Sequence, residues 1–172
     1  MADTVDESLH AQVKSIVDEL EAAASGSLYE VDGDWKVIYD LDEWKEAEYK
    51  KKADEFIGSH DGTWDADLYD SFDEYMEDEI GTVDDVDDPG EVSLGEYIDE
   101  QSLGDVRFEV DSEMTLHGGK VLFCFGGPNV WVADDEVRGY WGSSRCEMSL
   151  DSETRSALFS WFEERWDMAR GR

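Results

Sequence analysis

The fold is decided by residues 120–141, which read KVLFCFGGPNVWVADDEVRGYW. Gly-Gly-Pro-Asn and Asp-Asp separate three short apolar runs at 121–125, 130–133 and 137–141. Short runs rich in valine and aromatic residues, divided by such turn residues, are typical of strands joined as hairpins. Upstream, residues 106–110 alternate apolar and charged side chains, as a half-buried strand does. The pattern predicts an antiparallel meander.

A final helix is predicted after the meander. Asp151 or Ser152 fits its N-cap position, and an apolar stripe at helical spacing then follows: Leu158, Trp161, Phe162 and Trp166. We expect this stripe to pack against the sheet. The two cysteines, Cys124 and Cys146, both fall in predicted strands, and no further pair exists for a disulfide framework.

The first part of the chain reads as helical. Residues 4–24 carry apolar side chains three and four positions apart, with Thr4 and Glu7 as a capping box and Gly26 just past the end. A short strand is predicted at residues 35–39. A second helix is predicted at residues 41–57, closed by a glycine.

Two shorter helices are predicted further on, each beginning after a serine N-cap. Ser71 precedes Phe72 to Ile80, and Ser93 precedes Leu94 to Ile98. We therefore expect an α+β fold with N-terminal and central helices and a C-terminal antiparallel β-meander packed by a final helix. The expected parts are a helical N-terminal part (1–60), an acidic helical segment (61–113), and a sheet with a C-terminal helix (114–172). The last two are expected to form one compact domain.

Negative charge is concentrated in the middle of the chain. The whole sequence has 46 acidic and 14 basic residues, a formal net charge of −32. Residues 61–113 hold 21 acids and one cation, Arg107, whereas residues 114–172 hold nine acids and seven cations. A salt-adapted protein is expected to spread its acids over all faces, and a disordered acidic tail is expected to lack aromatic residues. The uneven distribution and the aromatic residues favour a folded surface for a basic partner.

The charge density of this segment is comparable to that of DNA. B-DNA carries one charge per roughly 1.7 Å, so twenty charges correspond to about one turn of duplex. From Asp70 to Asp78, carboxylates recur at spacings of three and four, with Cβ atoms about 5–6 Å apart. Like charges so placed weaken an isolated helix, so stability alone does not explain them. The candidate partner-binding residues are Asp65, Asp67, Asp70, Asp73, Glu74, Glu77, Asp78, Asp84, Asp85, Asp87 and Asp88, with Tyr69 and Tyr75 as either anchors or core residues.

Motifs for catalysis are not found in the sequence. Its histidines, His10, His60 and His117, are scattered, and carboxylate pairs are too numerous to single one out. We expect a protein that is not an enzyme and needs no cofactor. One alternative is a calcium-responsive regulator: Asp85, Asp87 and Glu96 stand at positions 1, 3 and 12 of a calcium loop. Proline at position 5 offers no side-chain ligand there, and an acidic turn is the simpler explanation of the match.

The ends and the hydropathy pattern set the expected location. No run of eighteen apolar residues exists, and the chain opens with acidic residues instead of a basic stretch followed by an apolar one. We expect a soluble protein of the bacterial cytoplasm that has no membrane partner.

A small, strongly acidic, aromatic-rich chain without catalytic motifs resembles the DNA-mimic inhibitors of phages and mobile elements, namely anti-CRISPR and antirestriction proteins. Residues 126–132 and 138–142 are also similar to small proteins from mobile elements of gut bacteria. The resemblance implies a partner with a basic nucleic-acid groove, such as a CRISPR effector or a restriction enzyme, and no direct contact with nucleic acid. The rival interpretation is an acidic binding module or chaperone for another basic protein.

Overall fold

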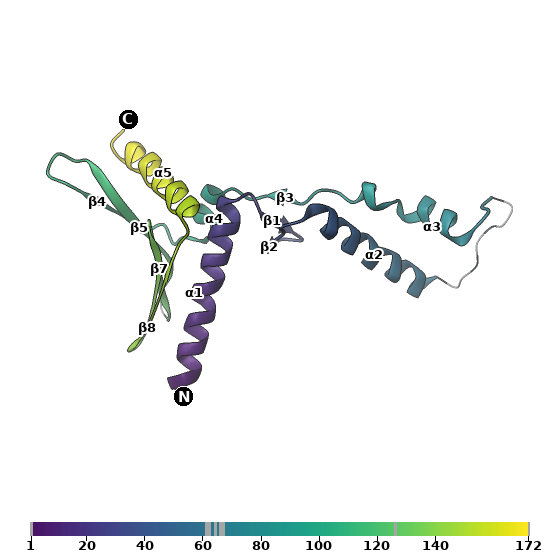
Figure 1. The fold of residues 1–172 in the computed structure, drawn as a ribbon, viewed down its shortest axis with the longest axis horizontal. Coiled ribbons are helices and arrows are strands. Elements are labelled where there is room, and N and C mark those ends of the chain that lie inside the picture. The colour runs from purple at the N-terminus through teal and green to yellow at the C-terminus, as the bar shows by residue number, and fades with distance from the viewer. Residues whose placement is uncertain (1, 61–62, 64, 66–67, 126, 172) are drawn as a thin grey trace. The chain divides into compact units, whose positions relative to one another are not determined.

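The computed structural model describes residues 2–60, 63, 65, 68–125 and 127–171, with the backbone alone for residues 2–4. Its five helices and antiparallel sheets confirm the predicted α+β fold (Figure 1). The chain forms two compact units. The core unit comprises Met1–Val37 and Glu91–Arg172, and the acidic unit comprises Ile38–Gly90. The boundaries expected at residues 60 and 113 were placed by the distribution of charge, whereas the boundaries of these two units are set by packing contacts.

The core unit contains the predicted meander as a five-stranded antiparallel sheet. Its strands pair in sequence order: β4 (Val106–Val110), β5 (Leu116–Cys124), β6 (Asn129–Ala133), β7 (Glu136–Trp141) and β8 (Ser144–Ser149). Strand β5 begins five residues before the predicted apolar run, because its glycines pair with β4: Phe108 lies opposite Gly119, and Glu109 opposite Gly118. The bounds of β8 were not predicted, since that strand has no continuous apolar run.

Two helices cover one face of this sheet (Figure 1). Helix α1 (Ala2–Ala24) contacts β7 and β8, and helix α5 (Ser152–Ala169) contacts β5. Two glycines permit this close approach. A Cβ atom at Gly139 would lie 2.6 Å from Val13 Cγ2, and one at Gly119 would lie 2.6 Å from the Phe162 ring. The core between helices and sheet includes Leu9, Leu20, Val121, Val130, Val132, Val137 and Leu158.

The helix ends differ partly from expectation. Helix α1 begins two residues before the predicted start, so Thr4 lies within the helix and not at its N-cap. Acidic side chains in a first turn interact favourably with the positive N-terminal end of the helix dipole, which is consistent with the earlier start. Helix α5 is capped by Asp151, whose carboxylate accepts a hydrogen bond from the backbone N–H of Thr154 at 2.7 Å. That bond lowers the pKa of Asp151 below its ordinary value.

A second sheet has the strand order β2-β1-β3: β1 (Leu28–Val31), β2 (Asp34–Val37) and β3 (Gly90–Glu91). The strand predicted at residues 35–39 is β2, which begins one residue earlier and ends two residues earlier than predicted. Its partner β1 was missed. Asp32 and Gly33 join them with φ of 56° and 81°, as a two-residue hairpin turn requires. Helix α4 (Leu94–Gln101) buries Tyr97 against Trp35, with ring centroids 4.7 Å apart.

Candidate functional site

The acidic unit is built from two helices and a short 3-10 turn: α2 (Leu41–Ser59), α3 (Phe72–Ile80) and η1 (Val83–Asp85). It contains twenty acidic residues and four lysines, so a formal charge of −16 lies on 53 residues. Ser71 caps α3 as predicted, because its hydroxyl accepts a hydrogen bond from the backbone N–H of Glu74 at 3.2 Å. Half of the net charge of the chain therefore lies on less than a third of its residues.

Ile38 is buried, but no described residue from 39 to 90 is. Helices α2 and α3 are held together instead by a half-buried cluster of rings. Phe56 lies 5.1 Å from His60 and 6.4 Å from Phe72, and Tyr75 lies 5.2 Å from Tyr69. His60 Nε2 is also 3.3 Å from the Tyr75 hydroxyl. Both predicted tyrosine anchors thus take part in packing while remaining partly exposed.

Lysines of α2 make three further polar contacts within the acidic unit. Lys52 Nζ donates a hydrogen bond to the carbonyl of Ile80, 2.7 Å away, where the dipole of α3 favours a cation. Lys45 forms an ion pair with Asp88 at 2.7 Å, and Lys51 forms a longer one with Glu48 at 3.6 Å. Lys45, Lys51 and Lys52 therefore act as local counter-charges.

A row of exposed carboxylates runs along α3. Its members are Asp70, Asp73, Glu74, Glu77 and Asp78, all exposed. Two of them have local partners. Glu74 accepts a hydrogen bond from the backbone N–H of Asp70 at 2.8 Å, and Asp78 accepts one from the Tyr69 hydroxyl at 2.5 Å. The bond to Asp78 raises the pKa of Tyr69 to about 12. Within the described part of the chain, the side chains of the other three make no hydrogen bond or ion pair.

The acids that follow α3 likewise include some with a local partner and some without an ion pair. Asp85 accepts hydrogen bonds from the N–H and hydroxyl of Thr82 at 2.8 and 2.9 Å, which lower its pKa. Asp88 is paired with a lysine, whereas Asp84 and Asp87 are exposed and form no ion pair with a described residue. Asp65 is also exposed. Asp67 lies outside the described residues.

The candidate calcium loop is not assembled as a metal site. Glu96 is part of the capping box of α4, where it accepts hydrogen bonds from the N–H and hydroxyl of Ser93 at 2.9 and 2.6 Å. Asp85 is engaged in η1, as described above, so both acids already serve as caps. Among the described residues, no three or more His, Cys, Asp or Glu side chains are grouped to hold a metal ion.

The histidines lie apart in the fold, and one of them approaches a cysteine. His10 Nδ1 lies 3.7 Å from Cys146 Sγ, but burial raises the pKa of this thiol and so disfavours the nucleophilic thiolate. His117 Nε2 lies 3.0 Å from Asp111 on the exposed surface. The raised pKa therefore does not favour an activated nucleophile at Cys146.

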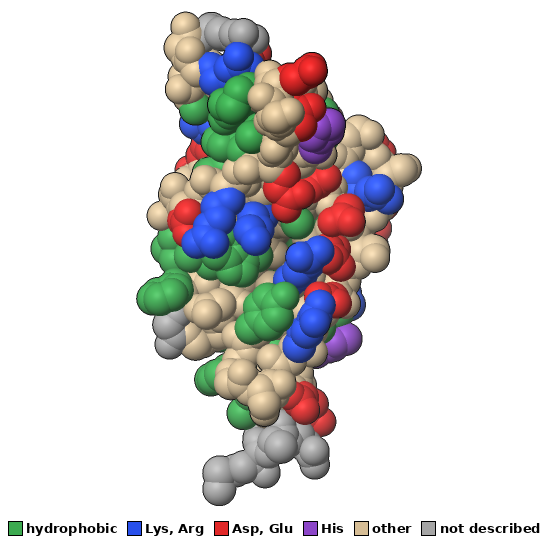
Figure 2. All heavy atoms as spheres, turned by 90° about the vertical axis from the view of Figure 1, so that its left-hand side faces the viewer, with side chains coloured by type: hydrophobic (Ala, Val, Ile, Leu, Met, Phe, Trp, Pro, Cys, Tyr) green, Lys and Arg blue, Asp and Glu red, His purple; other side chains and the backbone are tan. Residues whose placement is uncertain are grey.

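Sequence reasoning missed a second surface, on the side of the five-stranded sheet that α1 and α5 leave uncovered. Figure 2 shows Lys and Arg side chains gathered there, interleaved with carboxylates and hydrophobic groups. Four cations lie on it: Arg107, Lys120, Arg138 and Arg145. They come from four different strands, β4, β5, β7 and β8, and their side chains lie on the same side of the sheet. Only the strand register, which the sequence does not give, brings them together.

Comparison of the chain with protein-family models, with curated proteins and with solved structures found no match. None of the described helices combines the length and the apolar character that a membrane crossing requires.

Proposed function

We propose that this protein is a DNA-mimic inhibitor of a bacterial defence nuclease, most directly an anti-CRISPR protein that occupies the nucleic-acid groove of a CRISPR effector. The observation that carries the proposal is the exposed carboxylate row of α3, in which the side chains of Asp70, Asp73 and Glu77 form no hydrogen bond or ion pair with any described residue. Neighbouring positions in this row are about 5–6 Å apart, a separation comparable with that of phosphates along a strand.

Electrostatics favours this function over a purely structural role for the acids. Exposed like charges at these spacings destabilise a helix, and α3 has no buried residue to offset that cost. A lysine- and arginine-lined groove would neutralise the row and release the counter-ions held by both partners. Binding is then expected to weaken steeply with salt.

The lack of a core in the acidic unit also fits a surface that is completed by its partner. The ring cluster and the lysine contacts leave every described acid of the predicted set exposed. Tyr69 and Tyr75 are partly exposed beside the acids, and tyrosine is favoured at interface hot spots. They supply contacts that depend on shape as well as on charge.

The same surface serves two related alternatives. An antirestriction protein would present it to a restriction enzyme, and an acidic chaperone would present it to another basic protein. All three act in the bacterial cytoplasm, and all bind protein and not nucleic acid. Only the mimic must displace DNA from its target.

The test begins by capturing the partner from a bacterial lysate at low salt and identifying by mass spectrometry what elutes at high salt. The purified effector is then titrated with this protein before or after target DNA is added. Inhibition is expected only when the protein is added first. Equal inhibition in both orders, with DNA still bound, would show that the acidic unit does not occupy the DNA site.

A further inference from the structure

The uncovered side of the five-stranded sheet forms a continuous surface, which we call the outer sheet face. Its residues alternate with those that face the helices: Arg107, Lys120, Leu122, Trp131, Arg138, Tyr140, Arg145 and Glu147. Across the strands, Trp131 lies opposite Leu122 on one side and Arg138 on the other. Arg138 in turn lies opposite Glu147, and Tyr140 opposite Arg145. The face is therefore one layer of neighbouring side chains.

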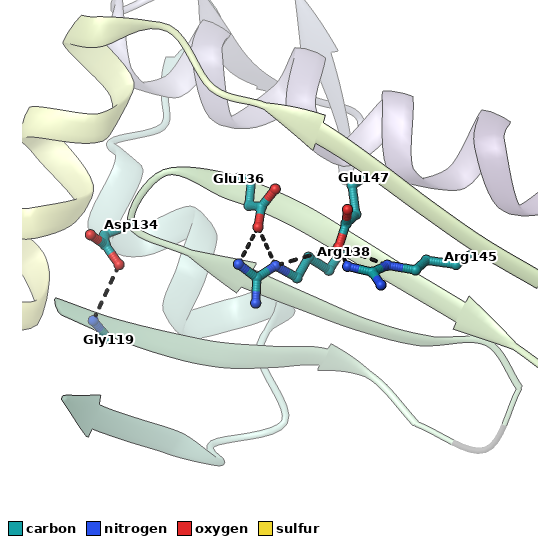
Figure 3. Close-up of polar contacts among 6 residues, drawn as sticks. All are labelled: Gly119, Asp134, Glu136, Arg138, Arg145 and Glu147. Atoms are coloured by element: carbon teal, nitrogen blue, oxygen red, sulfur yellow. Dashed lines mark hydrogen bonds and ion pairs between the residues drawn. The ribbon is translucent and has the colours of Figure 1, made fainter.

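The arginines of this face neutralise its carboxylates. Arg107 pairs with Asp105 at 3.0 Å. Arg138 pairs with Glu136 and, at 3.8 Å, with Glu147 (Figure 3). Arg145 also pairs with Glu147, its Nε lying 2.8 Å from the carboxylate. Although the chain has a net charge of −32, the charges on this surface are locally paired. The surface is also left uncovered by α1 and α5.

Aromatic side chains hold the cations in place. Arg107 lies 4.6 Å and Lys120 5.3 Å from the ring centroid of Trp131, and Arg145 lies 5.8 Å from that of Tyr140. Tyr140, which lies on this face opposite Arg145, is 36% exposed. Aromatic residues and arginine are the types enriched in the centres of protein interfaces.

We propose that the outer sheet face is the site at which a second copy of this chain docks, related to the first by a two-fold axis. Two copies repel each other wherever their acids are unpaired, so they can meet only where the charge is locally neutralised. About a two-fold axis the same face of each copy meets the other, so the arginine–carboxylate pairs and the rings of one copy pack against those of its partner. A basic partner is drawn instead to the acidic unit. A nucleic acid is not the expected ligand of this face, because the guanidinium groups of Arg107, Arg138 and Arg145 are already paired with carboxylates.

The size of the face sets the expected strength. Five strands about 4.8 Å apart, mostly five or six residues long at about 3.3 Å per residue, cover roughly 20 by 20 Å. Counted over both copies, about 800 Å² would be buried, which is less than the roughly 1,200–2,000 Å² of stable specific interfaces, so the dimer is expected to be weak and concentration-dependent. Salt is expected to strengthen it, because screening removes the long-range repulsion between two highly acidic chains. This dependence is opposite in sign to that of the proposed effector complex and is measured without an effector.

Analytical ultracentrifugation of the full chain, from micromolar to millimolar protein and from about 0.01 M to about 1 M sodium chloride, tests this inference. We expect self-association to increase with salt. Tyr140→Ser and Arg145→Glu are each expected to weaken it at least tenfold. The controls are Met168→Ser on α5 and Lys14→Glu on α1. Met168 is 58% exposed. The side chain of Lys14 is 58% exposed, close to the 60% of the Arg145 side chain. Both controls are expected to leave the dimer unchanged.

Three outcomes would overturn the inference. A monomer at every concentration and salt would show that no second copy docks. A dimer that persists equally in Tyr140→Ser and Arg145→Glu would place the contact elsewhere. A dimer that dissolves with added salt would indicate a contact with the acidic unit. Circular dichroism of each variant identifies loss of fold, and a labelled single-stranded oligonucleotide added to the same samples is expected not to bind.

Discussion

The core unit and the acidic unit differ in what stabilises them. In the core unit, two helices pack on one side of a five-stranded sheet, and residues such as Val121, Val132 and Phe162 are fully buried. In the acidic unit, no described residue beyond Ile38 is buried, and rings and lysines hold two helices together. The difference indicates a division of roles: one part of the chain provides stability, and the other keeps its carboxylates exposed.

The largest expected effect is in hydrogen exchange. Core amides of β6 and β7 should open only with global unfolding, whereas α2 and α3 should open locally for a few kcal/mol. A difference of about 4 kcal/mol corresponds to about a thousandfold in protection. Exchange followed by mass spectrometry should therefore show at least that contrast. Equal protection in both units would mean that the acidic unit is stabilised by contacts other than those described here.

A smaller but sizeable effect is expected for Gly119→Ala. The new methyl group would meet the buried ring of Phe162, and such overpacking costs about 1–3 kcal/mol. At about 2–4 °C per kcal/mol, the Tm should fall by several degrees. The control is Gly58→Ala in α2, where a Cβ atom meets nothing within 4 Å and replacing glycine in a helix stabilises by about 0.5–1 kcal/mol. If both substitutions changed the Tm in the same direction, Gly119 would not be in close contact with Phe162.

Added salt is expected to have a smaller effect on hydrogen exchange, and this effect should differ between the two units. Raising sodium chloride from about 0.01 M to about 0.1 M shortens the Debye length from about 30 Å to about 10 Å. Because repulsion is concentrated in the acidic unit, exchange in α2 and α3 should slow several-fold, while exchange in β6 and β7 should change little. An equal change in both units would show that the repulsion is shared by the whole chain.

The smallest effect concerns one hydroxyl in the acidic unit. Tyr69 donates a hydrogen bond to Asp78, which raises the pKa of the phenol from 10 to about 12. The bond therefore stabilises the folded state below pH 10 and is lost as the pH rises from 10 to about 12. Ultraviolet titration should show one tyrosine ionising near pH 12, and Asp78→Asn should lower that pKa. An unchanged titration curve in the variant would contradict the assigned contact.

Much of the fold could be predicted because its signals are local. The alternation of residues 106–110, the serine caps at Ser71 and Ser93 and the stripe of the final helix each depend on neighbouring residues, and the structure contains all of them. The missed strand β1 also had a local signal, since Asp32-Gly33 is a typical hairpin turn.

The remaining features depend on contacts between distant residues. Helix α1 packs on β7 and β8, and Tyr97 packs on Trp35, so packing places the unit boundary where charge alone does not. The exposed acids of α3 follow from helical spacing and were predicted. The local partners of Asp78 and Glu74 were not, because they depend on side-chain geometry.

The most direct test of the central claim compares two matched sets of substitutions. Asp73→Asn, Glu74→Gln and Glu77→Gln together neutralise three exposed acids of α3. Glu163→Gln, Glu164→Gln and Asp167→Asn neutralise three exposed acids at the same spacing on α5. The measurement is the concentration needed to keep target DNA from the captured effector. Exposed ion pairs contribute up to about 1 kcal/mol each, so three should change this concentration about tenfold or more. We expect that change for the α3 set and less than about twofold for the α5 set, whereas equal changes for both sets would contradict a binding surface located in the acidic unit.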